Sequence, residues 1–268
     1  MIEKIKSYDI FKNHPPLSCE PLAQQGHANT IYLIKTSQDI LQNSLESEAS
    51  APNKTRLKPS FPSFEKTPQK KYLLREFKIS IDRKTEFAIQ KKVYQHNIGA
   101  KPILLDREKG LMISEFIEGK HKEKLNQHEL KKMALLLKKL HKIKIRQKRN
   151  SFKENFSFKN KKVKRAFMIL EKEAKEYTLG HNDLHSQNIL FTKRAIKLID
   201  WEYARYSDIY FDLVSIIIEY KLNRKDKTTF LRSYFQRKKV NPKKIDAFTL
   251  IYNELWKLWF EKLERGEL

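Results

Sequence analysis

Residues 179–201, with the sequence LGHNDLHSQNILFTKRAIKLIDW, constrain the fold of this chain more than any other stretch. Asp183 is followed five positions later by Asn188, and Asp200 ends a short apolar run at 196–199. Such a run predicts a strand, so we expect Asp200 at a strand end and the other two side chains on a preceding loop. Carboxylate and amide oxygens suit Mg²⁺, and a carboxylate also accepts protons. The fold must therefore bring two loops together around these three side chains.

The spacing of His181, Asp183 and Asn188 is that of the catalytic loop H-x-D-x-x-x-x-N. In that template the Asp accepts the proton of the attacking hydroxyl, and the Asn, with an Asp from the next strand, holds Mg²⁺. Asp183 is therefore the predicted proton acceptor, and Asn188 and Asp200 are the predicted metal ligands. Protein kinases follow the second Asp with Phe-Gly, whereas this chain continues with Trp and Glu at 201–202, which argues against a protein kinase.

The order of these motifs resembles the aminoglycoside phosphotransferase and choline kinase family of small-molecule kinases, and within it the choline and ethanolamine kinases. The resemblance is carried by the catalytic loop, by IDWEYA at 199–204 and by Phe-Asp-Leu at 211–213. It implies a two-lobed, protein-kinase-like α+β fold with a small antiparallel-sheet N-lobe and a mainly helical C-lobe, and ATP and Mg²⁺ as cofactors. We expect residues 1–117 to form the nucleotide-binding N-lobe and 118–268 the catalytic and substrate-binding C-lobe.

Two short strands joined by a turn at Gly26 are predicted within 18–36, where β-favouring residues are bounded by turn formers. In a kinase-like N-lobe this hairpin covers the nucleotide phosphates, so Gly26 and Asn29 are candidate nucleotide-binding residues. Segment 37–71 is rich in Ser, Pro, Asn, Gln and Lys. It has too few apolar residues to offset the entropy of ordering, which predicts a long, mobile insertion between two N-lobe strands.

A strand cation followed by a helix carboxylate is the second nucleotide-binding signal. Arg75 lies in a predicted strand and Glu86 in a helix predicted over 83–94. By analogy with the strand Lys and helix Glu of kinases, Arg75 would hold the phosphates and Glu86 would orient it. Arg can bind a phosphate through two hydrogen bonds and does not lose its proton. Glu115 and Ile117, at the end of the next predicted strand, would present their backbone to the adenine.

The resemblance also implies a pocket for a small cationic alcohol, choline first and ethanolamine second. Trp256 and Trp259 lie three positions apart on a helix predicted over 244–263, beside its core stripe. A quaternary ammonium has no N–H to donate, so aromatic faces and carboxylates suit it best. The remaining candidates for this pocket are Glu202, Tyr203, Glu219 and Tyr220.

Three other polar residues near these motifs are expected to support them. Asp212, in a nearly all-apolar helix predicted over 209–220, resembles the structural Asp of the family and is predicted to tether the catalytic loop. His141 lies on the apolar stripe of another predicted helix and is expected to be a packed core residue. His185 is expected either to contact the substrate hydroxyl or to shape the loop, and not to act as the base.

The chain of 268 residues carries a formal net charge of +24, which raises nucleic acid or an anionic surface as a partner. Because Lys occurs in nearly every segment, we interpret the charge as a compositional habit and expect no obligate nucleic acid. The single cysteine, Cys19, excludes an intramolecular disulfide and favours a reducing compartment. No apolar run approaches the length of a membrane span, and a cytoplasmic location is predicted.

Two alternatives share parts of this pattern. A thiamine or aminoglycoside kinase would use the same catalytic residues and differ only in the acceptor pocket. A non-catalytic kinase-like protein would instead bind nucleic acid or an anionic surface through its basic face. Intact Asp183, Asn188 and Asp200 argue against the second alternative. The sequence leaves the acceptor, the nucleotide preference and the oligomeric state open.

Overall fold

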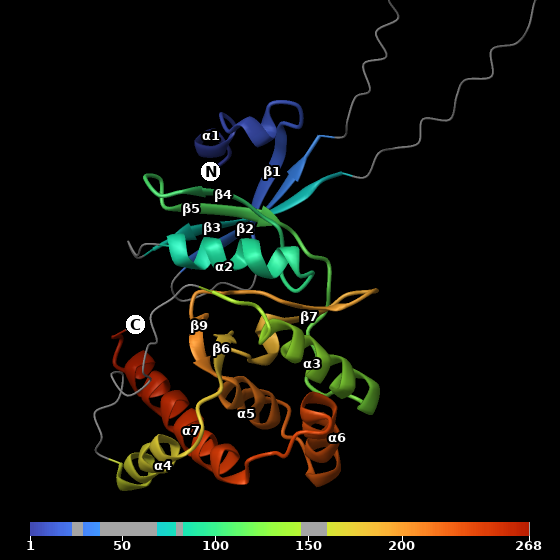
Figure 1. Cartoon of the computed structure of the whole chain (residues 1–268). Helices are drawn as coiled ribbons and strands as arrows, with labels where there is room; N and C mark the ends of the chain where they lie inside the picture. Colours follow the sequence, from blue (N-terminus) through green and yellow to red (C-terminus); the bar gives the residue numbers. More distant parts are fainter. Residues whose placement is uncertain (23–28, 38–68, 79–82, 146–159, 268) are drawn as a thin grey trace, which may run out of the picture.

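A computed structural model describes residues 1–22, 29–37, 69–78, 83–145 and 160–267. Its N-terminal half is built on an antiparallel sheet of five strands in the order β1-β2-β3-β5-β4 (Figure 1). Helix α1 (Ile2–Ile5) and the 3₁₀ helix η1 (Asp9–Phe11) precede the sheet. The strands are β1 (Pro16–Pro21), β2 (Asn29–Thr36), β3 (Lys71–Phe77), β4 (Pro102–Asp106) and β5 (Leu111–Glu115).

The pleat of β3 places Arg75 on the side of the sheet opposite the N-terminal core. Tyr72 and Leu74 of this strand are buried in a cluster with Ile5, Phe11 and other apolar residues. Successive strand residues point to opposite faces, so Arg75 lies on the other face. Helix α2 (Lys84–Gln95) runs along the sheet (Figure 1) and brings a carboxylate to that side chain.

The C-terminal half is mainly helical. Helix α5 is buried along most of its length, as expected for a segment that is apolar nearly all round. It packs against α7, which also packs against α4, while α3 packs against α6. These helices are α3 (Gln127–Leu140), α4 (Lys161–Lys172), α5 (Ile209–Glu219), α6 (Arg224–Phe235) and α7 (Pro242–Glu264).

Two short antiparallel ribbons lie between the sheet and the helices (Figure 1) and carry the predicted catalytic segments. In one ribbon Ile189 pairs with Leu198, and in the other Tyr177 pairs with Asp208. The elements are β6 (Tyr177–Gly180), η3 (Ser186–Asn188), β7 (Ile189–Phe191), β8 (Ile196–Leu198) and β9 (Arg205–Asp208).

The two-lobed, protein-kinase-like fold class predicted from the sequence is confirmed. The predicted helices over 83–94, 209–220 and 244–263 correspond to α2, α5 and α7. The turn at Gly26 and most of the predicted insertion at 37–71 lie outside the described residues. The lobe boundary between 117 and 118 stays a prediction and falls just after β5. Among the described helices, none combines the length and apolarity needed to cross a membrane.

Candidate active site

The catalytic loop holds Asp183 in place through the side chain of Asn188. The Asn188 Nδ2 donates to the Asp183 carbonyl oxygen at 2.9 Å and to its carboxylate Oδ2 at 2.8 Å. Asn188 ends the 3₁₀ helix η3, and this short turn brings the two side chains together across four intervening residues. The spacing seen in the sequence therefore corresponds to direct contact.

Asp212 of α5 anchors the start of this loop through backbone hydrogen bonds. It lies in the first turn of α5 and accepts hydrogen bonds from the backbone amides of His181 and Asn182, each at 2.8 Å. Its Oδ2 also lies 3.1 Å from Nε2 of the buried His141. Burial alone would raise the pKa of Asp212, but these hydrogen bonds and the His141 side chain lower it. The geometry matches the expected scaffold role of Asp212 and the buried position expected of His141.

A second tie joins the catalytic loop to Asp200. The His181 Nε2 lies 2.9 Å from the carbonyl oxygen of Ile199, and the Ile199 amide donates to the Asn188 carbonyl oxygen at 3.0 Å. Asp200 has a positive φ of 62°, a conformation that Asp tolerates better than most residues. The chain thereby turns sharply after β8, and Trp201 packs into the core against the His181 ring, with centroids 4.5 Å apart.

The surroundings of Asp183 raise its pKa to about 7. Burial is the largest cause, followed by the negative charges of Asp200 and Glu202. A carboxylate with a pKa near neutrality is matched to proton transfer at physiological pH. Strongly shifted carboxylates occur in structural ion-pair networks as well, but this one lies on the predicted catalytic loop.

Arg75 from β3 reaches the same cluster from the other lobe. It forms a buried ion pair with Glu86 of α2, as the sequence predicted for the strand cation and the helix carboxylate. Its Nη2 lies 3.2 Å from Asp200 and 3.6 Å from Glu202. The phosphate-binding and metal-binding candidates thus form one continuous group of charges.

The sequence analysis missed Arg83, the N-cap residue of α2. Its Nη1 lies 2.7 Å from Glu202 and 3.2 Å from Glu86, and its guanidinium stacks 4.8 Å from the centroid of the Phe77 ring. The available signal was the pair Arg83 and Glu86, three positions apart at a helix start, where the side chains are neighbours. Glu202, predicted for the acceptor pocket, is placed in this cation cluster.

Three of the predicted acceptor residues lie beside the catalytic loop. Glu219 accepts a hydrogen bond from the Ser186 amide at 3.0 Å. The Trp256 ring lies 6.1 Å from the His185 ring, and His185 in turn lies 3.6 Å from Asp183. Half-exposed Tyr203 has its pKa raised to about 12, first by burial and then by the charges of Glu202 and Asp183.

The aromatic side chains near the end of α7, Trp256, Trp259 and Phe260, form an aromatic wall beside the catalytic loop. Trp256 and Trp259 pack edge to face with centroids 5.6 Å apart, and both contact Phe260, which is 51% exposed. Tyr252, one turn before Trp256, packs 6.2 Å from it, and burial raises its pKa, with the charges of Glu219 and Asp183 adding to the rise. The sequence pattern places Tyr252 on one helix face with Trp256 and Trp259, and the structure brings the Tyr252 and Trp256 rings together.

Tyr220 is placed differently from the other predicted pocket residues. Its side chain is buried in the C-lobe core, and burial raises its pKa, with Glu219 and Glu129 as the neighbouring charges. Among the predicted nucleotide-binding residues, Asn29 is buried at the start of β2. Glu115 is exposed at the end of β5, and its backbone amide donates a hydrogen bond to the carbonyl oxygen of Lys101. Ile117 follows in the segment that leaves the N-lobe, and Gly26 lies outside the described residues.

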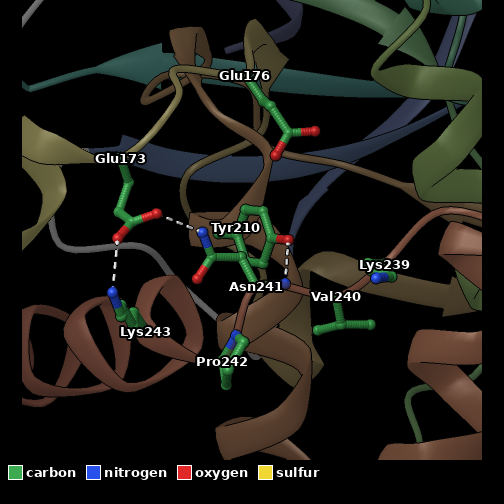
Figure 2. Close-up of a pocket in the computed structure, with 8 residues that line it drawn as sticks. All are labelled: Glu173, Glu176, Tyr210, Lys239, Val240, Asn241, Pro242 and Lys243. Atoms are coloured by element: carbon green, nitrogen blue, oxygen red, sulfur yellow. Dashed lines mark hydrogen bonds and ion pairs between the residues drawn. The ribbon is translucent and has the colours of Figure 1, made fainter.

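A separate pocket of about 460 Å³ lies at the start of α7 (Figure 2). Its polar groups satisfy one another: the Asn241 side chain donates to Glu173 at 2.7 Å, and the Asn241 amide donates to the Tyr210 hydroxyl at 2.9 Å. Lys243 lies 3.6 Å from Glu173. These contacts cap the helix and join it to α4 and α5, so we interpret this pocket as a structural junction.

The fold and the loop geometry are those of the kinase-like phosphotransferases, in which an Asp, an Asn and a second Asp meet between two lobes. Residues 63–248 match the model of the phosphotransferase enzyme family known as APH, and the chain belongs to this family. It is therefore a member of a family of phosphotransferases.

Among the individual relatives and solved structures similar to this chain are kinases of choline or ethanolamine and homologues of the protein LicA. A protein LicA homolog of Metamycoplasma hominis is 30% identical over 178 residues, covering 60% of this chain and 70% of the relative. The crystal structure of choline kinase LicA from Streptococcus pneumoniae has a TM-score of 0.71 at 22% identity, over 100% of this chain and 92% of that one. An ethanolamine kinase of Plasmodium vivax has a TM-score of 0.66 at 20% identity, over 93% and 76%. At these identities the two solved structures establish the fold.

Proposed function

We propose that this protein transfers the γ-phosphoryl group of ATP to the hydroxyl of choline, with ethanolamine as the second acceptor. The observation that carries the proposal is the position of Asp183. Its carboxylate contacts Asn188 and shares its charge environment with Asp200, and it also lies near His185, whose ring packs against Trp256. A proton acceptor between a metal-binding group and an aromatic surface suits phosphoryl transfer to a cationic alcohol.

Asp183 would orient the acceptor hydroxyl and take its proton. The Asn188 amide fixes one carboxylate oxygen, which leaves the carboxylate oriented by the loop and not free to rotate. The raised pKa makes Asp183 a stronger proton acceptor than an ordinary carboxylate, provided that it is ionised at the working pH.

Asn188 and Asp200 fit a magnesium ion. The buried Oδ1 of Asp200 accepts no hydrogen bond from the described residues, although the Arg75 guanidinium lies nearby. Asn188 uses its amide nitrogen on Asp183, so its amide oxygen remains for a cation. Oxygen donors of this kind, completed by phosphates and water, form the usual magnesium site. Bound Mg²⁺ would neutralise charge on the phosphates.

Arg75 would hold the phosphates from the N-lobe, steadied by Glu86. Because its guanidinium is buried among carboxylates, it remains fully charged and points into the cluster that contains Asp200. Gly26 and Asn29 in the phosphate-covering hairpin, and Glu115 and Ile117 beside the adenine, remain proposed nucleotide contacts.

The acceptor would lie against Trp256 and Trp259, with Tyr203 and Glu219 near the catalytic loop. A trimethylammonium group gains attraction from aromatic faces and from nearby carboxylates without needing a hydrogen-bond acceptor. The similarity to choline kinase LicA and to an ethanolamine kinase supports this class of acceptor. Glu202 and Tyr220 remain weaker candidates, since the first pairs with arginines and the second lies in the core.

The test is Mg²⁺-dependent ADP release by the purified protein with choline, ethanolamine, thiamine or an aminoglycoside as acceptor. Turnover with choline or ethanolamine that disappears in Asp183→Ala would support the proposal. Turnover only with thiamine or an aminoglycoside would keep the chemistry and overturn the acceptor. If no acceptor is phosphorylated and salt-sensitive nucleic-acid binding survives in Asp183→Ala, the non-catalytic alternative takes its place.

The aromatic wall has its own test. Trp256→Leu should raise KM for choline about tenfold or more and raise KM for ethanolamine less, because a primary ammonium can compensate through hydrogen bonds. KM for ATP should stay within about twofold, since Trp256 lies on the acceptor side. The matched control is Tyr94→Leu, which removes a partly exposed aromatic side chain from α2. Equal losses for both acceptors would contradict the cation–π role.

A further inference from the structure

Among the residues that the structure describes, the charge cluster between the lobes joins three carboxylates to two arginines. Glu86, Asp200 and Glu202 share the guanidinium groups of Arg75 and Arg83. All three carboxylates lie within 3.6 Å of Arg75. If Arg75 alone had to neutralise them, each carboxylate would compete with a phosphate for its guanidinium.

Arg83 changes this distribution. It approaches Glu202 to 2.7 Å, whereas Arg75 approaches the same carboxylate only to 3.6 Å, so Arg83 is the main partner of Glu202. It also takes the second oxygen of Glu86, at 3.2 Å, while Arg75 takes the first. The Arg83 guanidinium also lies over the Phe77 ring, and only 6% of its side chain is exposed.

The contact also spans the two lobes. Arg83 is the N-cap residue of α2, and Glu202 lies in the segment that follows β8 and contains Asp200. The two residues are 119 positions apart in the chain. A buried cation whose Nη1 contacts both Glu86 and Glu202 can fix the distance between α2 and the loop that carries a proposed metal ligand.

We propose that Arg83 is a positioning residue for nucleotide binding, which holds Glu202 and Glu86 and keeps Glu202 from becoming a closer partner of Arg75. The inference rests on the proposed function, since it concerns the same phosphate site. Arg83 acts through Glu202 and need not touch the nucleotide itself. Loss of Arg83 lets Glu202 move onto Arg75 and compete there with the phosphates.

The experiment compares ADP affinity by titration calorimetry, in Mg²⁺ buffer, for wild type, R83Q, R83K, E202Q and the double variant R83Q/E202Q. We expect R83Q to weaken ADP binding about tenfold or more, as for loss of one partner of a buried charge pair. R83K keeps the charge without the planar fork and should bind within about threefold of wild type. In the E202Q background the same R83Q change should weaken ADP binding by less than about threefold, because the competing carboxylate is absent.

Kinetics provide a second measurement. R83Q should raise KM for ATP by a factor similar to the loss of ADP affinity and leave KM for the acceptor within about twofold. Arg232→Gln, an exposed arginine on α6, is the matched control and should behave as wild type. Circular dichroism of each variant checks that the fold is retained, and R83K together with the double variant still tests the idea if R83Q alone does not fold.

Three results would overturn the proposal: unchanged ADP affinity in R83Q, an equal loss in the E202Q background, or failure of wild type to bind ADP. The second result would mean that Arg83 binds phosphate directly or acts only on stability. If wild type binds ADP but phosphorylates no acceptor, the proposed function fails while the affinity cycle still decides the role of Arg83.

Discussion

Replacing Asp183 by Asn should stabilise the metal-free protein while abolishing its activity. On folding, the pKa of this carboxyl rises from 3.8 to about 7, mainly because it is buried and secondly because Asp200 and Glu202 are nearby. Asn has a similar shape, cannot ionise, and keeps an oxygen that can accept the hydrogen bond from Asn188. The substitution therefore removes the cost of the buried charge and retains the loop contact.

The expected size follows from linkage between proton binding and folding. A pKa raised from 3.8 to about 7 corresponds to about 4 kcal/mol of lost stability above pH 7. Because 23% of the Asp183 side chain is exposed, water screens part of this cost, and we expect a gain of about 2–4 kcal/mol. For a chain of this size that is about 4–8 °C in Tm.

The sign of the pH dependence is specific. Between about pH 4 and pH 7 folded wild type retains a proton that the unfolded chain releases, so its stability falls as the pH rises through this window. The Asn variant has no such proton at this position. Its advantage over wild type should therefore be small near pH 4, grow up to about pH 7 and stay constant above.

The assay is thermal and urea unfolding from pH 5 to pH 8 in buffer with a metal chelator and no nucleotide. Asp246→Asn, at an exposed position on α7, is the matched control and should shift Tm by less than about 1 °C. An Asn variant at 183 that is no more stable than wild type at pH 8, or whose gain is the same at pH 5, would refute the reasoning. Retained kinase activity in that variant would refute the catalytic role of Asp183.

Two further predictions concern the scaffold of the loop. Asp212→Asn should destabilise the protein by about 3 kcal/mol and lower kcat, because an amide cannot replace every acceptor contact to His181 and Asn182; urea unfolding and single-turnover rates measure the two effects. Gly180→Ala should cost about 1–3 kcal/mol, since a Cβ there would lie 2.3 Å from the Ser207 hydroxyl oxygen. Adding Ser207→Ala should restore most of that loss in the same unfolding assay, and a loss that persists would contradict the proposed clash.

Much of the catalytic loop could be predicted from the sequence because its geometry is local. Asp183 and Asn188 are joined by one short turn, and a chain with this spacing brings the two side chains into contact. The apolar run before Asp200 predicted a strand, which corresponds to β8, and the nearly all-apolar segment at 209–220 predicted a buried helix, which corresponds to α5. In each case the signal and the structure span fewer than about 20 residues.

The side chains around the loop were harder to place from the sequence. Glu219 and Tyr220 are adjacent in the chain, yet the first binds the catalytic loop and the second is buried in the core. Tyr220 follows the last residue of α5, so its direction depends on how the helix ends and what packs there. The helical repeat of Tyr252 with Trp256 was visible in the sequence but did not reveal that its hydroxyl lies near the charge of Asp183.

By itself, then, the sequence determined the contact between Asp183 and Asn188, the two-lobed fold class and the pairing of Arg75 with Glu86. Only the tertiary structure showed that Glu202 is held by Arg83 and that these charges form a single cluster with Asp200. The physical reason is that backbone geometry follows from short-range spacing, whereas the partner of a charged side chain depends on which distant segments pack beside it. Inside a buried cluster, each carboxylate takes the nearest cation that the packing supplies.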